Sequence, residues 1–297
     1  MYTDNLIRNV AKGVLSPFPQ LKRVLVKNER RLRTAYLRWK HPNGGFLSCN
    51  GVRVCCDFRD PNYVWYDGYS EYLEYELSVF NDLLARRAPD VVLDVGAHFG
   101  IFPASLTKSL NASRIKRVIC VEPDSRPFAM LVRTVAATSG NGLVVQAINA
   151  AISDRDGTVG LYSGGGMCRQ TYSSSGAVSI GSVKAVSLDS LVKKYLDDGE
   201  VITHVKLDID GYEPAFFAGG EATIAAHRPL VMMEFWPEGL ARSGKDIAAY
   251  WQQLQGRFFV KEASFSKKSL VDVPVEGLPA LIESVAGGIT NLVLFPK

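Results

Sequence analysis

The sequence predicts an α/β fold with a doubly wound, mostly parallel sheet, preceded by an N-terminal cap of helix and strand. Five short apolar segments are each typical of a buried parallel strand. Acidic residues stand near the carboxyl ends of four of them, and a glycine turn follows the first. The segments are residues 91–100, 117–123, 143–154, 201–213 and 229–236.

The first segment predicts a ligand-binding loop. It ends in Asp94 and a turn with Gly96 and Gly100, and glycines let a backbone approach a bound molecule closely. A side chain at Gly96 would therefore be expected to occupy the ligand's place. Glu122 lies 26 residues after Gly96, near the end of the second segment. An acidic residue there suits the two hydroxyls of a ribose, so we expect a nucleoside-containing cofactor at this sheet edge.

The missing motifs narrow the choice of cofactor. The turn lacks the G-x-G-x-x-G spacing of dinucleotide sites, and no P-loop motif occurs in the chain. Asp94 would repel a phosphate but suits a cationic group. S-adenosylmethionine fits, because it offers a ribose to Glu122 and an ammonium to Asp94 and has no phosphate. The alternative is a glycine turn that binds no ligand.

Six motifs carry a resemblance to a known family. They are DVGAHFG (94–100), VEP (121–123), AAISDRDG (150–157), SLDSL (187–191), KLDIDGYE (206–213) and the strand 229–234. In this order, over about 140 residues, they resemble the FkbM family of S-adenosylmethionine-dependent methyltransferases. The resemblance implies a class I, Rossmann-like methyltransferase sheet. Tyr212 and Asp210 stand where the family usually has His and Glu, so the acceptor site is expected to differ in detail.

The candidate site residues follow from these patterns. The candidate cofactor-binding residues are Asp94, Gly96, His98, Gly100, Glu122 and Asn149. Methyl transfer to a hydroxyl needs a base or a metal, and Asp208 at the end of the fourth segment is the first choice. With Glu234 of the fifth segment it could instead hold a divalent cation such as Mg²⁺, or it could simply pair with Lys206.

Glu234 and His98 are the other catalytic candidates. His98 is considered because an imidazole has an unperturbed pKa of about 6.5. Its place inside the glycine turn also allows a role in loop geometry alone. The three remaining histidines are expected to be structural or solvated: His41, His204 and His227.

The predicted activity is O-methylation of a hydroxyl on a sugar or glycoconjugate. One alternative is methylation of another small molecule, such as a polyketide or an amine. A second alternative is a cofactor-binding scaffold without catalysis.

The N-terminal arm is strongly basic. Residues 1–40 hold ten Lys and Arg against two acidic residues, so they carry +8 and the rest of the chain −4. Apolar residues between Leu21 and Trp39 follow the spacing of one helical face. Such a helix can pack on the core or lie on an anionic membrane. Nucleic acid is an unlikely partner, because the remainder of the chain is slightly acidic.

Residues 1–88 are predicted to form this arm and a cap, and residues 89–297 the cofactor-binding domain. Within the cap, residues 51–58 alternate like a strand. Residues 62–80 are rich in tyrosines and carboxylates, which suits either a carbohydrate-binding wall or a helix packed on the sheet. Residues 158–187 indicate strands joined by a loop that could cover the cofactor.

The composition excludes some other classes of protein. Five cysteines without a C-x-x-C motif indicate free thiols rather than disulfides or a zinc site. No signal peptide and no run of 18 apolar residues is found, so we expect a cytoplasmic protein with a possible peripheral place at the inner face of a membrane.

Overall fold

The computed structural model describes residues 31–297, apart from 67–69, 139–141, 164–168, 171–177 and 286. The chain forms two compact units, residues 1–45 and residues 46–297. In the first unit residues 31–40 form a helix on which Leu32, Tyr36 and Trp39 are exposed. Within the described part of the chain, no helix has the length and apolar character needed to cross a bilayer.

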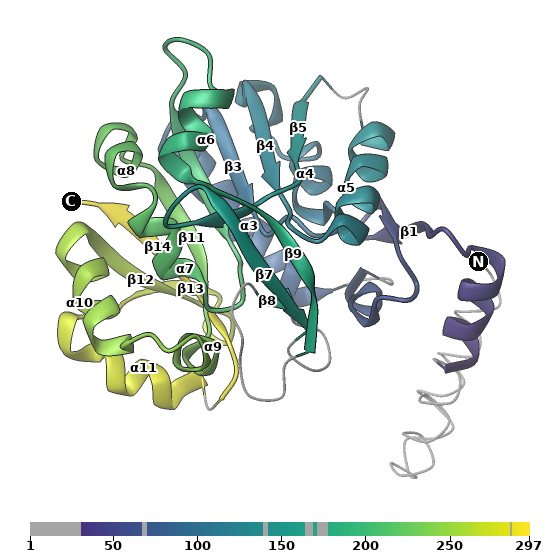
Figure 1. Cartoon of the computed structure of the whole chain (residues 1–297). Helices are drawn as coiled ribbons and strands as arrows, with labels where there is room; N and C mark the ends of the chain where they lie inside the picture. The colour runs from purple at the N-terminus through teal and green to yellow at the C-terminus, as the bar shows by residue number, and fades with distance from the viewer. Residues whose placement is uncertain (1–30, 67–69, 139–141, 164–168, 171–177, 286) are drawn as a thin grey trace. The chain divides into compact units, whose positions relative to one another are not determined.

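The second unit contains an eight-stranded sheet (Figure 1). Its strands, in spatial order, are β13 (Ser269–Asp272), β12 (Phe258–Ser264), β14 (Thr290–Pro296), β11 (Leu230–Phe235), β10 (Ile202–Leu207), β3 (Val91–Val95), β4 (Arg117–Val121) and β5 (Val144–Ile148). The five strands from β11 to β5 are parallel, whereas β14 runs antiparallel to both β11 and β12. Chain order reverses between β3 and β10, which is where a ligand crevice is expected in such a sheet.

Helices cover both faces of the sheet, as the doubly wound prediction requires. On one face, Phe80, Phe102 and Leu131 pack against Val92 and Val118. They belong to α3 (Glu71–Arg86), α4 (Ile101–Leu106) and α5 (Ser125–Thr138). The five predicted strands are thus confirmed. The central strands β3 and β10 are buried at every position, whereas the edge strand β5 begins at the exposed Val144.

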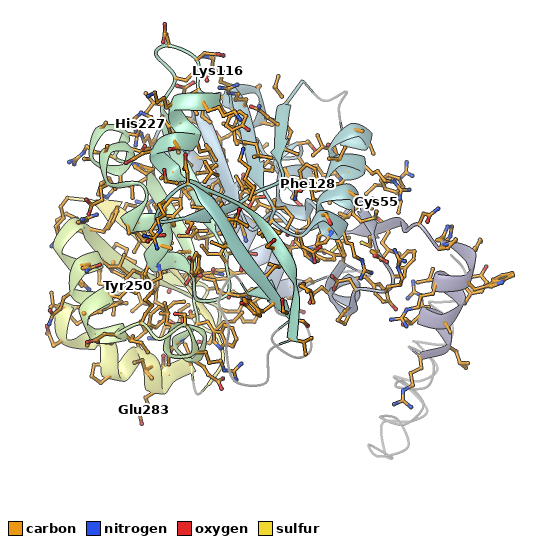
Figure 2. The ribbon with its side chains drawn as sticks, in the orientation of Figure 1. Cys55, Lys116, Phe128, His227, Tyr250 and Glu283 are labelled. Carbon is orange, nitrogen blue, oxygen red and sulfur yellow. The ribbon has the colours of Figure 1, made fainter. Side chains whose placement is uncertain are left out.

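The opposite face is covered by helices from the second half of the sequence. Phe216, Ile224, Trp251 and Leu281 join its apolar cluster, and Figure 2 shows Tyr250 among the side chains on this side. The helices are α6 (Leu188–Tyr195), α7 (Glu213–Ala218), α8 (Glu221–His227), α9 (Pro237–Arg242), α10 (Ile247–Arg257) and α11 (Leu278–Val285).

One predicted helix is divided in two. The sequence after the fourth predicted strand, residues 201–213, predicts one helix that extends to about Ala226. The structure instead has a break at Gly219 and Gly220, between α7 and α8. A Cβ at Gly219 would lie 2.1 Å from the carbonyl oxygen of Ser153, so only glycine allows the chain to approach so closely here. Ser153 belongs to β6 (Ala151–Ser153), which is not part of the main sheet.

A second sheet has the order β6–β9–β7–β8, with β7 (Gly157–Ser163), β8 (Arg169–Gln170) and β9 (Val178–Ser187). Figure 1 shows β7 and β9 lying across the front of the main sheet. The third predicted strand therefore ends at Ile148, and its expected continuation pairs with β9 instead. The loop predicted to cover the cofactor, within residues 158–187, lies largely outside the described residues.

The cap contains a hairpin of β1 (Gly45–Cys49) and β2 (Val52–Cys56), followed by a 3₁₀ helix, η1 (Pro61–Tyr66). The strand predicted within residues 51–58 is confirmed. Four cysteines are buried free thiols, as expected: Cys49, Cys55, Cys56 and Cys120. Cys168 lies outside the described residues.

Candidate functional site

A cavity of about 700 Å³ lies at the carboxyl edge of the parallel strands. It is lined by the ends of β3, β4, β10 and β11 and by side chains of η1 and α3. Its charged lining residues are Glu76, Asp94, Glu122, Lys206, Asp208, Asp210 and Glu234. The cavity therefore lies where the strand order reverses, between β3 and β10. Acidic side chains outnumber basic ones in its charged lining.

Asp94 is a fully buried carboxyl group near the end of β3. Neither of its oxygens has a hydrogen-bond partner in the described protein. Burial raises its pKa to about 7, against the opposing effect of the Lys206 ammonium. Buried polar atoms are nearly always satisfied, so these oxygens fit the donor groups of a ligand in the cavity.

Glu122 stands just after β4 with both oxygens anchored by backbone donors. Oε2 accepts a hydrogen bond from the N–H of His98, and Oε1 accepts one from the N–H of Asp124, each at 2.9 Å. Burial raises the pKa of Glu122 to about 8, and these two hydrogen bonds oppose that shift. The carboxyl group is thus fixed in direction, which suits the recognition of two adjacent hydroxyls.

The fold of the protein requires glycine at position 96, independently of any ligand. Its φ is +85°, and a Cβ would lie 1.8 Å from the backbone oxygen of Asp208. The prediction that a side chain here would occupy the ligand's place gives the wrong reason for the glycine. The side chain would first collide with the backbone at the end of β10. The sequence could not reveal this neighbour, which is more than one hundred residues away in the chain.

His98 is held firmly beside the cavity. Its φ is +47°, which is uncommon for a residue with a side chain. Its Nδ1 lies 2.9 Å from the hydroxyl oxygen of Tyr66, and its Nε2 lies 3.7 Å from Oδ2 of Asp60. These contacts support a role in loop geometry, and the catalytic role of His98 stays a prediction.

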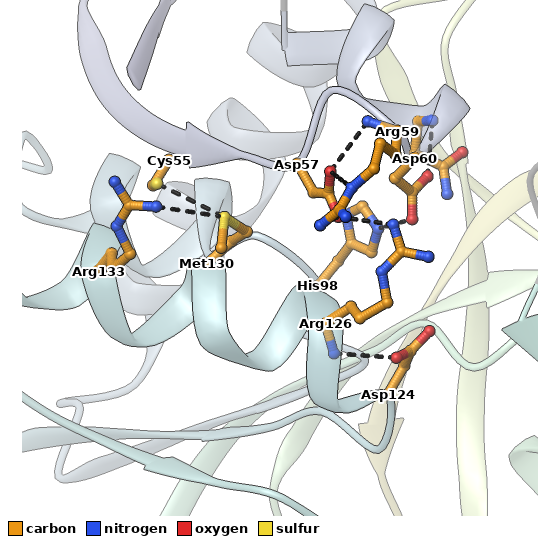
Figure 3. Close-up of polar contacts among 10 residues, drawn as sticks. Cys55, Asp57, Arg59, Asp60, His98, Asp124, Arg126, Met130 and Arg133 are labelled. Atoms are coloured by element: carbon orange, nitrogen blue, oxygen red, sulfur yellow. Dashed lines mark hydrogen bonds and ion pairs between the residues drawn. The ribbon is translucent and has the colours of Figure 1, made fainter. Parts of the chain in front are cut away.

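A buried aspartate anchors the turn that carries Asp60 (Figure 3). Asp57 Oδ1 accepts from Nε of Arg59 at 3.0 Å, and its Oδ2 accepts from Arg126 of α5 at 2.7 Å. Although burial opposes ionisation, these arginines lower the pKa of Asp57 to about 2. Figure 3 shows His98, which belongs to the glycine turn, next to this group. The turn is therefore packed beside a cluster of ionised side chains.

Lys206 is the one cation in the charged lining of the cavity within the described chain. Its Nζ donates to Oδ2 of Asp208 at 2.8 Å and lies 3.8 Å from Oε1 of Glu76. Burial disfavours its charge, but Asp208, Glu76 and Asp94 together raise its pKa well above the usual range. The predicted alternative that Asp208 pairs with Lys206 is confirmed, and both partners also line the cavity.

Glu234 lies near the end of β11, and burial together with Asp208 and Asp210 raises its pKa well above the usual range. This favours a protonated group that can donate a hydrogen bond. The aromatic residues of the cavity wall include Tyr72, Tyr212 and Trp236. The hydroxyl oxygen of Tyr72 accepts from Nδ2 of Asn291 at 2.9 Å.

The donor set does not favour the predicted divalent cation. The carboxylate of Asp208 already faces the ammonium of Lys206, and Glu234 favours its neutral form. Over the residues that the structure describes, no group of three or more His, Cys, Asp or Glu side chains is suited to a metal ion.

Comparison with known proteins identifies the family. Residues 94–258 match the model of the methyltransferase FkbM domain, which is more than half of the chain. The chain belongs to the FkbM methyltransferase family. No curated protein sequence matches it.

Solved structures similar to this FkbM chain include three methyltransferases. The methyltransferase FkbM from Methylobacillus flagellatus is 14% identical, with a TM-score of 0.44 over 70% of this chain and 44% of that one. This chain thus spans less than half the length of that protein. An O-methyltransferase from Bacillus cereus with bound SAH is 13% identical (TM-score 0.42, 74% and 80% covered). An O-methyltransferase of tomaymycin synthesis from Streptomyces achromogenes, with bound SAM, is 12% identical (TM-score 0.41, 75% and 80% covered).

Most of the predicted site residues line this cavity of the FkbM protein. These are Asp94, Gly96, His98, Glu122, Asp208 and Glu234. Gly100 and Asn149 do not line it. Gly100 begins α4 beside Leu131, and the Asn149 amide donates to the carbonyl oxygens of Glu122 and Pro123 at 2.8 and 3.0 Å.

Tyr66, Glu76 and Trp236 are among the lining residues that were not predicted from the sequence. The aromatic and acidic character of residues 62–80 gave a signal for the first two. His204 is buried, and its Nε2 lies 3.0 Å from the carbonyl oxygen of Leu83, which agrees with the structural role expected for it.

Proposed function

We propose that this protein is an S-adenosylmethionine-dependent O-methyltransferase that acts on a hydroxyl of a sugar or glycoconjugate. One observation carries the proposal. Two buried carboxyl groups at adjacent strand ends, Asp94 and Glu122, face the same cavity as the ion pair of Lys206 and Asp208. Membership of the FkbM family supports the methyltransferase part of the proposal.

The cofactor end fits S-adenosylmethionine. The unpartnered oxygens of Asp94 would accept from its ammonium, and the anchored carboxyl of Glu122 would accept from its ribose hydroxyls. A cavity of about 700 Å³ is within the range of cofactor sites. When bound, the cofactor supplies an electrophilic methyl group; the protein has to align the acceptor and remove its proton.

The acceptor end fits a polar ring. Aromatic faces of Tyr72, Tyr212 and Trp236 offer apolar contact to the C–H faces of a sugar. The carboxylate of Asp208 accepts the proton of the reacting hydroxyl, and protonated Glu234 donates to a neighbouring oxygen of the acceptor. These residues come from three separate elements and meet only in the folded chain.

The test has two stages. Calorimetry should first show micromolar binding of S-adenosylhomocysteine and no binding of NAD. Labelled S-adenosylmethionine is then offered with free glycans, lipid-linked sugars, a polyketide alcohol panel and amines, with and without chelator. Label transfer to a sugar hydroxyl is expected. Transfer to a polyketide or an amine alone would overturn the acceptor class, and binding without any transfer would indicate a cofactor-binding scaffold.

We also propose a cytoplasmic protein whose N-terminal helix lies on an anionic membrane. The charge of +8 within residues 1–40 is complementary to anionic lipid, and Leu32, Tyr36 and Trp39 are exposed. The full chain should float with vesicles containing phosphatidylserine, less so at high salt, and not with neutral vesicles. Trp39→Glu should reduce flotation, whereas Phe259→Glu, at an exposed aromatic residue of β12, should not. Equal flotation with both vesicle types would contradict the proposal.

A further inference from the structure

We infer that Lys206 and Asp208 act as a pair on the acceptor oxygen, so that the site selects a neutral hydroxyl over a protonated amine. Asp208 takes the hydroxyl proton, while the ammonium of Lys206 donates a hydrogen bond to the same oxygen. This inference rests on the proposed function and assigns a role to Lys206, which the sequence suggested only as a structural partner.

The geometry leaves donors of Lys206 available to a ligand. The residue is 7% exposed and lines the cavity beside Asp208. An ammonium has three N–H donors, and one of them bonds to Asp208 at 2.8 Å. Glu76 lies at 3.8 Å, which is within ion-pair range but beyond a hydrogen bond. N–H groups therefore remain beside the carboxylate that receives the proton.

The charge arrangement suits an oxygen that becomes negative. Lys206 remains an ammonium because Asp208, Glu76 and Asp94 surround it, so a fixed positive charge stands where the acceptor loses its proton. Prepositioned charges of this kind stabilise a developing oxyanion strongly in a site shielded from water. A protonated amine would instead meet a like charge and would have no lone pair with which to attack.

The acceptor O–H bond breaks and its proton passes to Asp208. The oxygen lone pair forms the new O–CH₃ bond as the S–CH₃ bond of S-adenosylmethionine breaks. That bonding pair stays on sulfur, which leaves neutral S-adenosylhomocysteine.

Binding of two cofactor analogues tests the inference without any acceptor. Sinefungin carries an amine where S-adenosylmethionine carries the transferred methyl, whereas S-adenosylhomocysteine carries neither. The ratio of their dissociation constants therefore reports the charge at the transfer position and cancels effects elsewhere in the site. Calorimetry measures both ligands on the full chain and on each variant.

Lys206→Met should favour sinefungin over S-adenosylhomocysteine by at least fivefold relative to wild type, since a like charge is removed. Asp208→Asn should shift the ratio at least fivefold the other way, and Lys206→Arg should leave it within twofold. The matched control is Lys261→Met, which removes a lysine paired with Asp272 at 2.7 Å outside the cavity. Its ratio should equal that of wild type.

Unchanged ratios in Lys206→Met and Asp208→Asn, with S-adenosylhomocysteine still bound, would overturn this inference alone. Should Lys206→Met fail to fold, Asp208→Asn and Lys206→Arg decide by the same ratio. Failure of wild type to bind S-adenosylhomocysteine would overturn the proposed function itself. Methylation of an amine acceptor by wild type would also contradict the inference.

Discussion

The cofactor end and the acceptor end of the cavity are built in different ways. At the cofactor end, Asp94 and Glu122 stand at the ends of neighbouring parallel strands, and nearby backbone N–H groups fix Glu122. At the acceptor end, Glu76, Lys206 and Glu234 come from α3, β10 and β11, and ionic contacts connect the first two. The proposed cofactor would thus be bound by groups that local backbone geometry fixes, whereas the proposed acceptor would be bound by side chains that distant elements bring together.

The largest predicted effect is a loss of stability at Gly96, where the cofactor end contacts the backbone of the acceptor end. Gly96→Val should reduce the free energy of unfolding by about 3 kcal/mol or more, because its Cβ would lie 1.8 Å from the backbone oxygen of Asp208. Urea unfolding measures this change. Gly199→Val is the control, since Gly199 has a similar φ of +81° with nothing within 4 Å of a Cβ. Equal losses in both variants would show that backbone strain, not the contact between the two ends, explains the requirement.

The next prediction separates the two ends by chemistry. Asp208→Asn should lower turnover on the acceptor found in the screen by about a hundredfold or more, because the proton acceptor is lost. Its affinity for S-adenosylhomocysteine should stay within twofold, since Asp208 belongs to the acceptor end. A full turnover rate in this variant would move proton removal elsewhere, and His98 would then be the residue to substitute.

Glu122→Ala provides the reverse case. It should weaken S-adenosylhomocysteine binding by about 1–3 kcal/mol, because an oriented acceptor of the ribose hydroxyls and the anchor of the His98 N–H are both lost. Turnover at saturating cofactor should fall much less than in Asp208→Asn. Glu238→Ala, at an exposed residue of α9, serves as the control. Unchanged binding in Glu122→Ala would remove the ribose assignment.

The smallest predicted effect is a pH dependence at the cofactor end. The pKa of Asp94 is raised to about 7, so in the free protein this group is mostly protonated below pH 7 and ionised above it. The ammonium of S-adenosylhomocysteine requires the ionised form, so its affinity should fall about tenfold between pH 8 and pH 6. Asp94→Asn should bind more weakly and show a flatter profile. A wild-type affinity independent of pH would argue against contact between Asp94 and the ammonium.

The difference between the cofactor end and the acceptor end also explains which features could be predicted from the sequence. Asp94 and Glu122 each follow an apolar run directly, so the strands and the cofactor end were predictable from local patterns. Glu76 does not follow an apolar run. Its contact with Lys206 depends on the packing of α3 against a strand that lies 130 residues later in the sequence. The separate pairing of β6 and the split at Gly219 also depend on contacts between distant segments. Local patterns carry no information about such distant pairing, so these features emerge only from the folded structure.

The position of β14 has a consequence for how the protein is made. Residues 290–296 fill the place between β11 and β12, although they follow every other strand in the sequence. During translation, β11 therefore leaves the ribosome well before the strand that covers its open side. Until that strand arrives, the unpaired N–H and C=O groups of β11 can associate with another chain. The main sheet is thus completed only when β14, the last of its strands to be synthesised, pairs with β11 and β12.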